Sequence, residues 1–314
     1  MTTHPRVRYD RLPTERSDPR SRELDRLSPI GIARLMNRAD QEAVRAVARA
    51  APAIARTVEL IVQALSAQGR LIFVGAGTSG RLGVLEAAEC PPTFGTSSEL
   101  VQAVIAGGRR AVSRSAEGAE DDAAEGARQM GRRVRRGDVV IGIAASGVTP
   151  FVRGALDTAR RRRAMTVLVT CNPRVSRRAA RVVIPLVVGP EVLAGSTRLK
   201  AGTATKLTLN TLTTAAFARL GKVYGNRMVD LRPRSAKLRA RARRLVSEIG
   251  GVGQAEATRL LEAAGGSAKL AIVMARLEVP AGEARQRLKA AKGSLAGLLG
   301  GTVCSRASGS GPRR

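Results

Sequence analysis

The stretch from Arg70 to Pro92, RLIFVGAGTSGRLGVLEAAECPP, constrains the fold more than any other part of the chain. It opens with an apolar, β-branched run, Leu71–Val74, which is short enough for a buried strand. A loop of small residues (75–80) follows, and apolar residues then recur at helical spacing until Pro91 and Pro92, where we expect the helix to end. Backbone N–H groups in such a loop lie at the positive end of the helix dipole. The stretch therefore predicts an anion site of the kind that binds a phosphate.

The same loop also matches the glycine spacing of the dinucleotide-binding fingerprint, through Gly75, Gly77 and Gly80. That fingerprint requires an acidic residue at the end of the second strand, where it holds a ribose. The next apolar run, Leu100–Ile105, ends in Ala-Gly-Gly and supplies no carboxylate there. The spacing alone is weak, and we expect no nucleotide cofactor.

Strands and helices alternate in the pattern between residues 71 and 220. We predict strands at 71–74, 100–105, 138–144, 165–170 and 182–188, and helices over 117–134, over 151–160 and from the segment 190–205 through Leu220. Two further helices are expected between Pro29 and Ala67, and Pro52 starts the second of them. This alternation predicts an α/β fold with a doubly wound, parallel five-stranded sheet.

Changes in composition divide the chain into four predicted parts. Residues 1–22 read as a flexible N-terminal arm, residues 23–231 as the domain that holds the sheet, residues 236–300 as a small domain of three or four short helices, and residues 301–314 as a disordered tail. The chain has neither an apolar run long enough to span a bilayer nor a signal peptide. We expect a cytoplasmic protein without a membrane partner.

The histidine and cysteine content restricts the chemistry. The only histidine is His4, so the body of the chain offers no Ser-His-Asp triad, no Cys-His pair and no histidine metal ligand. Cys90, Cys171 and Cys304 show no C-x-x-C spacing, which argues against both a zinc site and a disulfide framework. A general acid or base must therefore be a carboxylate, Lys, Tyr or Cys.

The net charge of +29 raises the alternative of a nucleic-acid-binding protein. However, the basic residues are mostly Arg, they are spread along the whole chain, and few aromatic side chains are available to stack on bases. We expect no specific nucleic-acid partner, only salt-sensitive attraction to polyanions.

Several long blocks resemble the N-acetylmuramic acid 6-phosphate etherases, enzymes of the sugar isomerase (SIS) superfamily. These blocks are GRLIFVGAGTSGRLGVLEAAECPPTFG, IAGG…EGAEDD, DVVIGIAASGVTP, CNP, GPEVLAGSTRLKAGTATKLTLN and GKVYGNRMVDL, and the resemblance extends from about Leu24 to Leu299. It implies an SIS fold, a homodimer, and a sugar phosphate as substrate. It also implies cleavage of the D-lactyl ether by elimination followed by hydration, without a metal or nucleotide cofactor. The alternative is a non-catalytic sugar-phosphate sensor on the same fold, like the glucokinase-regulator relatives.

The resemblance assigns two catalytic glutamates. Glu89 resembles the proton donor to the lactyl oxygen, and Glu120 resembles its partner, which we interpret as the base at C2. Spacing alone would admit Glu86 and Glu117 in their place. Loop chemistry and the SIS pattern together give the candidate substrate-binding residues Thr78, Ser79, Gly80, Ser146, Gly147, Thr149, Ser196, Thr197 and Lys200.

Two positions depart from the family pattern. Val148 stands where the family usually has Arg, and Asp18, after the Thr14-Glu15 signature, stands where Asn is common. Both differences concern substrate affinity rather than the reaction itself.

Overall fold

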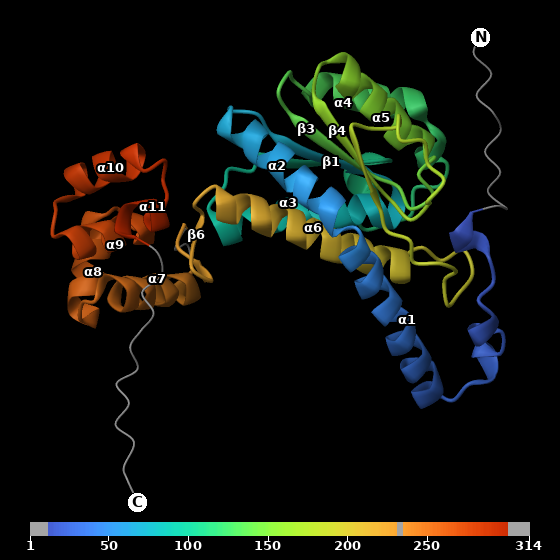
Figure 1. Ribbon diagram of the computed structural model, residues 1–314, viewed down its shortest axis with the longest axis horizontal. Helices are drawn as coiled ribbons and strands as arrows, with labels where there is room; N and C mark the ends of the chain where they lie inside the picture. Colours follow the sequence, from blue (N-terminus) through green and yellow to red (C-terminus); the bar gives the residue numbers. More distant parts are fainter. Residues whose placement is uncertain (1–11, 231–234, 301–314) are drawn as a thin grey trace, which may run out of the picture. The chain divides into compact units, whose positions relative to one another are not determined.

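The structure, a computed structural model, describes residues 12–230 and 235–300, so the predictions for residues 1–11, 231–234 and 301–314 lie outside it (Figure 1). Its centre is a parallel sheet of five strands in the order β2-β1-β3-β4-β5. The strands are β1 (Leu71–Gly75), β2 (Val101–Ile105), β3 (Val139–Ile143), β4 (Met165–Thr170) and β5 (Val182–Pro185). The predicted α/β class and the five strands are confirmed, although β5 ends three residues earlier than expected.

Helices cover both faces of the sheet. Figure 1 shows α4 (Ala123–Arg133) and α5 (Pro150–Arg161) on one face, and α2 (Ala51–Ser66), α3 (Gly77–Phe94) and α6 (Lys200–Arg219) on the other. Alternate side chains of the strands, such as Ile72 and Val140, pack with Phe151 of α5 in one apolar cluster. The first helix, α1 (Pro29–Arg49), is followed directly by α2, and Pro52 lies in the first turn of α2 as predicted.

Two helix boundaries differ from the prediction. Helix α3 does not stop at Pro91 and Pro92 but contains both and continues to Phe94. The missing donor of Pro92 would have bonded the carbonyl four residues earlier, on the exposed Ala88, where water can replace it. The acidic run 117–122 is not part of the following helix either. It forms a loop with the 3₁₀ turn η6 (Ala119–Asp121), because Asp122 caps α4 by accepting a hydrogen bond of 2.7 Å from the Glu125 backbone N–H.

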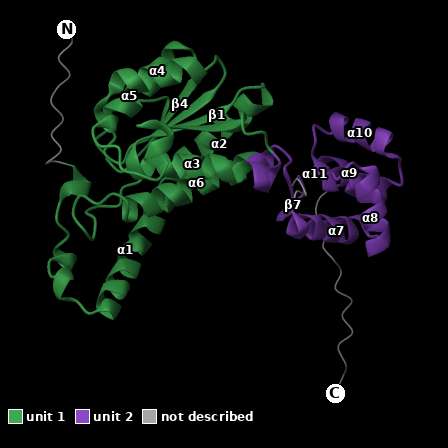
Figure 2. Ribbon diagram, turned by 180° about the vertical axis from the view of Figure 1, so that it is seen from behind, with its two compact units in different colours: residues 1–90, 96–216 green, residues 91–95, 217–314 purple. Residues whose placement is uncertain are grey.

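The chain divides into two compact units, residues 1–90 with 96–216 and residues 91–95 with 217–314 (Figure 2). The second unit holds a two-stranded antiparallel hairpin, β6 (Val223–Tyr224) and β7 (Arg227–Met228), and then five helices rather than the three or four expected: α7 (Ala236–Gly250), α8 (Gln254–Ala263), α9 (Ala268–Leu277), α10 (Ala281–Ala290) and α11 (Leu295–Leu299). Its apolar core has a polar neighbour in the 8% exposed Lys269, which donates to the carbonyl of Gly221 and to Asp230.

None of the helices within residues 12–230 and 235–300 combines the length and the apolar character that crossing a membrane requires.

Candidate functional site

A cavity of about 280 Å³ lies beyond the carboxyl ends of β1 and β3. In parallel sheets covered by helices on both faces, this edge is where ligands bind. The cavity is lined by Leu12, Thr14, Glu15, Ala76, Gly77, Thr78, Ser79, Glu120, Asp121, Ile143, Ala144, Ala145, Ser146, Thr149, Pro150, Gly195 and Thr197. Hydroxyl groups and carboxylates therefore share its wall, and none of these lining side chains is basic.

The first hydroxyl loop enters the cavity at the start of α3. Gly77, Thr78 and Ser79 form the first turn of this helix, whose backbone N–H groups have no partner within the helix. Gly80, by contrast, does not line the cavity and serves packing, because a Cβ there would lie 2.8 Å from the carbonyl oxygen of Gly75. The N–H groups, the hydroxyls and the helix dipole make this turn suited to a phosphate.

The second hydroxyl loop connects β3 to α5. Ser146 Oγ accepts a hydrogen bond of 3.2 Å from the Val148 backbone N–H and lies 3.4 Å from Thr149 Oγ1. Gly147, between them, has a φ of +72°, and a Cβ there would clash with Val175, so the turn requires glycine. Gly147 is thus structural, and Ser146 and Thr149 face the cavity.

The segment after β4 holds this second loop in place. The side-chain amide of Asn172 donates to the carbonyl of Ser146 at 2.9 Å, and the Thr170 hydroxyl donates to the carbonyl of Ala145 at 3.2 Å. The backbone N–H of Cys171 donates to the same Ala145 carbonyl at 2.9 Å. The Cys-Asn-Pro block of the sequence therefore positions the loop without lining the cavity.

The acidic wall of the cavity comes from η6. Glu120 and Asp121 both line it, and neither carboxylate is hydrogen-bonded or ion-paired to another residue in the described part of the chain. Glu120 also borders a second cavity of about 240 Å³, which Glu117 lines as well. Arg81 of α3 supports this region by donating at 3.0 Å to the carbonyls of Val112 and Arg114.

The third loop, which connects β5 to α6, contributes fewer cavity-lining residues than the sequence predicted. Gly195 and Thr197 line the cavity, but Ser196 does not. The remaining wall comes from residues near the N-terminus, where Thr14 and Glu15 reach the cavity. The sequence contained a signal for them, the Thr14-Glu15 signature, but a signature does not reveal which part of the fold it contacts.

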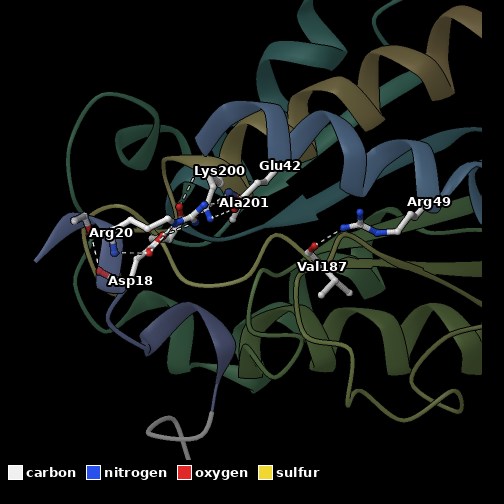
Figure 3. Close-up of polar contacts among 9 residues, drawn as sticks. Asp18, Arg20, Glu42, Arg49, Val187, Lys200 and Ala201 are labelled. Atoms are coloured by element: carbon white, nitrogen blue, oxygen red, sulfur yellow. Dashed lines mark hydrogen bonds and ion pairs between the residues drawn. The ribbon is translucent and has the colours of Figure 1, made fainter. Parts of the chain in front are cut away.

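Lys200 lies away from the cavity, contrary to its selection as a substrate-binding candidate. Its side chain is 1% exposed, and its Nζ forms an ion pair of 2.7 Å with Glu42 of α1 (Figure 3).

The carboxylate of Glu191 caps α6. It is fully buried and accepts hydrogen bonds of 2.9 Å from the backbone N–H groups of Lys200 and Ala201. Burial raises the pKa of Glu191, and the two backbone donors oppose this shift.

The two catalytic candidates differ in their relation to the cavity. Glu120 lines the cavity, but Glu89 is exposed and does not. Glu89 follows Gly77 by twelve residues on α3, which corresponds to about 18 Å along a helix axis at 1.5 Å per residue. Its neighbour Glu86 has a structural role, because it is 4% exposed and accepts from Thr213 Oγ1 at 2.5 Å and Lys206 Nζ at 2.8 Å.

Two cysteines are unsuited to acid–base chemistry. Burial raises the pKa of Cys90 and of Cys171 to about 12, so both thiols stay neutral at physiological pH. The carboxylates of the cavity are then the natural proton acceptors among the groups that line it.

The chain is similar to several known proteins. The family model of the glucokinase regulatory protein N-terminal SIS domain matches residues 53–160. The N-acetylmuramic acid 6-phosphate etherase of Synechocystis sp. is 49% identical over 286 residues, covering 90% of this chain and 94% of the relative. The enzymes of that name from Symbiobacterium thermophilum (53% identical, covering 85% and 89%) and Rubrobacter xylanophilus (51%, covering 93% and 97%) match similarly. Among solved structures, an E. coli CFT073 protein in complex with A5P aligns over 62% of this chain and 93% of its own, with 18% identity and a TM-score of 0.45.

Proposed function

The chain belongs to the N-acetylmuramic acid 6-phosphate etherase family, and we propose that it cleaves the D-lactyl ether of N-acetylmuramic acid 6-phosphate, giving N-acetylglucosamine 6-phosphate and D-lactate. The observation that carries this function is the sequence identity of about one half to etherases, over nearly the whole length of both chains. It is a carbon–oxygen lyase of cell-wall sugar recycling. Its place of action, we infer, is the cytoplasm.

The proposed chemistry needs a base and an acid but no redox step. In the open-chain sugar the C1 aldehyde acidifies the C2 proton, and the ether oxygen on C3 lies β to the carbonyl. A base removes the C2 proton while the C3–O bond breaks, and an acid protonates the departing lactate oxygen. Water then adds at C3 and a proton returns to C2. Two carboxylates are sufficient for these transfers.

The geometry supports a definite orientation of the substrate. The first turn of α3 and the loop with Ser146 and Thr149 offer hydroxyl and N–H donors, which suit the phosphate. The carboxylates of Glu120 and Asp121, which line the same cavity, would repel a phosphate and suit the sugar carbons and hydroxyls. We therefore assign Glu120 as the C2 base.

Glu89 completes the site, we propose, from a second copy of the chain. As the acid that protonates the lactyl oxygen it must approach a substrate held near Gly77, yet its own helix carries it about 18 Å away. Large apolar side chains are exposed on the same unit, such as Leu85 on α3 at 43% and Val44 on α1 at 56%. A homodimer would cover these side chains and deliver Glu89 to the partner's cavity.

Isotopic labelling tests the reaction. The protein incubated with N-acetylmuramic acid 6-phosphate should release D-lactate, and product formed in D₂O should carry deuterium at C2. In ¹⁸O-water the label should appear at C3 of N-acetylglucosamine 6-phosphate, since the C3–O bond breaks. Label in lactate with no deuterium at C2 would instead indicate attack at the lactyl carbon and would refute the elimination mechanism.

Mixed dimers test the origin of Glu89. The Glu89→Gln and Glu120→Gln variants should each be inactive alone. Co-expressed chains should regain up to about a quarter of wild-type activity, because half of the randomly formed dimers then hold one intact composite site. A mixture as inactive as its parents, or an active monomer in light scattering, would contradict the composite site.

A further inference from the structure

The segment of residues 12–28, called the arm below and distinct in its bounds from the predicted arm of residues 1–22, carries a carboxylate into the wall of the cavity. Its η2 turn (Pro13–Glu15) places Thr14 and Glu15 there. The arm is fixed at this point, since Leu12 is 7% and Thr14 3% exposed, and the backbone N–H of Gly195 donates to the Thr14 carbonyl at 3.0 Å. Glu15 thus belongs to a segment docked on the third loop of the sheet edge.

Glu15 lies against the backbone of that loop. Gly195 has a φ of +78°, and a Cβ built on it would lie 3.0 Å from Oε2 of Glu15. The side chain of Glu15 forms no hydrogen bond or ion pair with any residue of 12–230 or 235–300, although the chain holds 54 basic residues against 25 acidic ones. No side chain or backbone group among these described residues occupies its oxygens.

A series of ion pairs, called the ladder here, links the arm to α1 and to the start of α6 (Figure 3). Asp18 receives Arg20 Nη2 at 2.6 Å, and Arg20 Nη1 contacts Glu42 Oε1 of α1 at 2.5 Å. The other oxygen of Glu42 binds Lys200 Nζ at the start of α6. Hydrogen bonds from Arg20, together with Lys200, lower the pKa of Glu42 to about 2, so the ladder is charged at neutral pH.

We propose that Glu15 is a substrate-contacting residue that accepts hydrogen bonds from neutral donors of the sugar, a hydroxyl group or the acetamide N–H, and that Arg20 is a positioning residue for it. An ionised carboxylate only accepts hydrogen bonds, and it repels phosphate. Glu15 therefore selects for the hydroxyl-rich part of the ligand rather than for the phosphate. The inference rests on the proposed function only for the identity of the sugar.

Binding measurements separate this role from a structural one. We compare the wild-type protein with the Glu15→Ala variant and, as a matched control, the Glu23→Gln variant, which changes a 74% exposed carboxylate of the same arm. The probes are the product N-acetylglucosamine 6-phosphate and inorganic phosphate. The loss of a hydrogen bond to a charged group should weaken binding of the sugar phosphate roughly ten- to hundred-fold in the Glu15→Ala variant. Inorganic phosphate should bind equally well or more tightly, because a like charge is gone.

The outcomes distinguish this inference from the proposed function. Unchanged affinity for the sugar phosphate in the Glu15→Ala variant, with the wild type releasing D-lactate, would overturn the role of Glu15 and leave the etherase intact. Equal weakening of both probes would also overturn it, since that would indicate a collapsed cavity. A wild-type protein that binds the sugar phosphate through Glu15 but releases no lactate would refute only the proposed function.

The Arg20→Ala variant tests the positioning role. Without the guanidinium the arm loses its link to Glu42, so KM for the sugar phosphate should rise several-fold while kcat changes less. Arg22→Ala is the matched control, because Arg22 is exposed on the same arm and forms no ion pair within the described residues. A fall in kcat alone, or the same KM change in both variants, would contradict the role of Arg20.

Discussion

The two edges of the central sheet use the same type of side chain in opposite ways. At the amino edge, Asp138 before β3 is 1% exposed, and it accepts from the Arg70 backbone N–H at 2.9 Å, from Arg70 Nη2 at 2.7 Å and from the Arg135 backbone N–H at 2.8 Å. At the carboxyl edge, Glu120 and Asp121 line a cavity without any such donors among the described residues. A carboxylate with its oxygens occupied stabilises the fold, and one with free oxygens can take a proton or a ligand.

This difference is informative because bases outnumber acids so heavily. With 54 Lys and Arg residues against 25 Asp and Glu, a carboxylate easily finds a cation. Most buried acids of the first unit do have partners, such as Glu86 with Lys206. Glu15, Glu120 and Asp121, which have no such partner among the described residues, line the cavity.

The largest effect should come from the carboxyl edge. Glu120→Gln keeps the shape of the side chain but removes its basicity, so kcat should fall by about 10²–10⁴-fold, the usual contribution of a general base. The melting temperature should stay close to that of the wild type because the carboxylate of Glu120 has no partner to lose. Exchange of the C2 proton into D₂O should stop as well. If C2 proton exchange persists in Glu120→Gln and stops in Glu89→Gln, then Glu89 is the base and Glu120 the acid.

The amino edge should show the reverse pattern. Asp138→Asn leaves the 15% exposed Arg70 side chain beside a neutral amide, and breaking a pair this buried should cost about 3 kcal/mol of unfolding free energy. Urea denaturation measures this loss. Turnover per folded molecule should be unchanged. A variant with normal unfolding free energy but reduced turnover would show that Asp138 does not have a purely structural role.

Ser146→Ala should have an intermediate effect at the carboxyl edge. One hydrogen bond from a hydroxyl to a charged phosphate oxygen contributes about 1.5–3 kcal/mol, so affinity for the sugar phosphate should drop roughly ten- to hundred-fold. The matched variant Ser176→Ala alters another Ser of the same unit, which does not line the cavity, and should bind normally. Equal turnover of unphosphorylated N-acetylmuramic acid by the wild type would show that no phosphate site exists at this loop.

Local sequence patterns predicted the strands, loops and helices around the site, but not the side-chain contacts between segments that are distant in sequence. The strand, loop and helix around Gly75–Gly80 follow from apolar periodicity and small residues, which act within a few positions of each other. The burial of Lys200 could not be read in this way, because its partner Glu42 is distant in sequence and approaches only through the packing of α1. The docking of the Glu15 segment likewise involves residues distant in sequence, because the backbone N–H of Gly195 donates to the carbonyl of Thr14.

The position of Glu89 along its helix could be derived from the sequence. A helix from Gly77 through Glu89 already implies a separation of about 18 Å, because the rise per residue is fixed. The distance of Glu89 from the first turn of α3, which lines the cavity, therefore follows from helix geometry. Local sequence patterns do not reveal the surface of the homodimer that we propose.

We expect the smallest loss of stability from a substitution in the arm, where Asp18 binds an arginine in the same way as Asp138 does at the amino edge. Asp18 accepts from the backbone N–H, Nε and Nη2 of Arg20, as Asp138 does from those of Arg70. The difference is solvent, because the side chain of Arg20 is 53% exposed and that of Arg70 is 15%. Asp18→Asn should therefore cost only about 0.2–1 kcal/mol, the usual range for ion pairs screened by water.

The pH dependence of this small difference tests its cause. The side-chain hydrogen bond from Arg20 holds the pKa of Asp18 below its ordinary value of 3.8, against the opposing effect of burial. A depressed folded-state pKa means that the stabilisation is complete above the unfolded value and is lost as the pH falls through the folded one. The stability gap between wild type and Asp18→Asn should thus be present at pH 7 and should close as the pH drops below 3.8. A gap that persists at low pH would show that Asp18 supports the arm through packing alone, and the parallel with Asp138 would then fail.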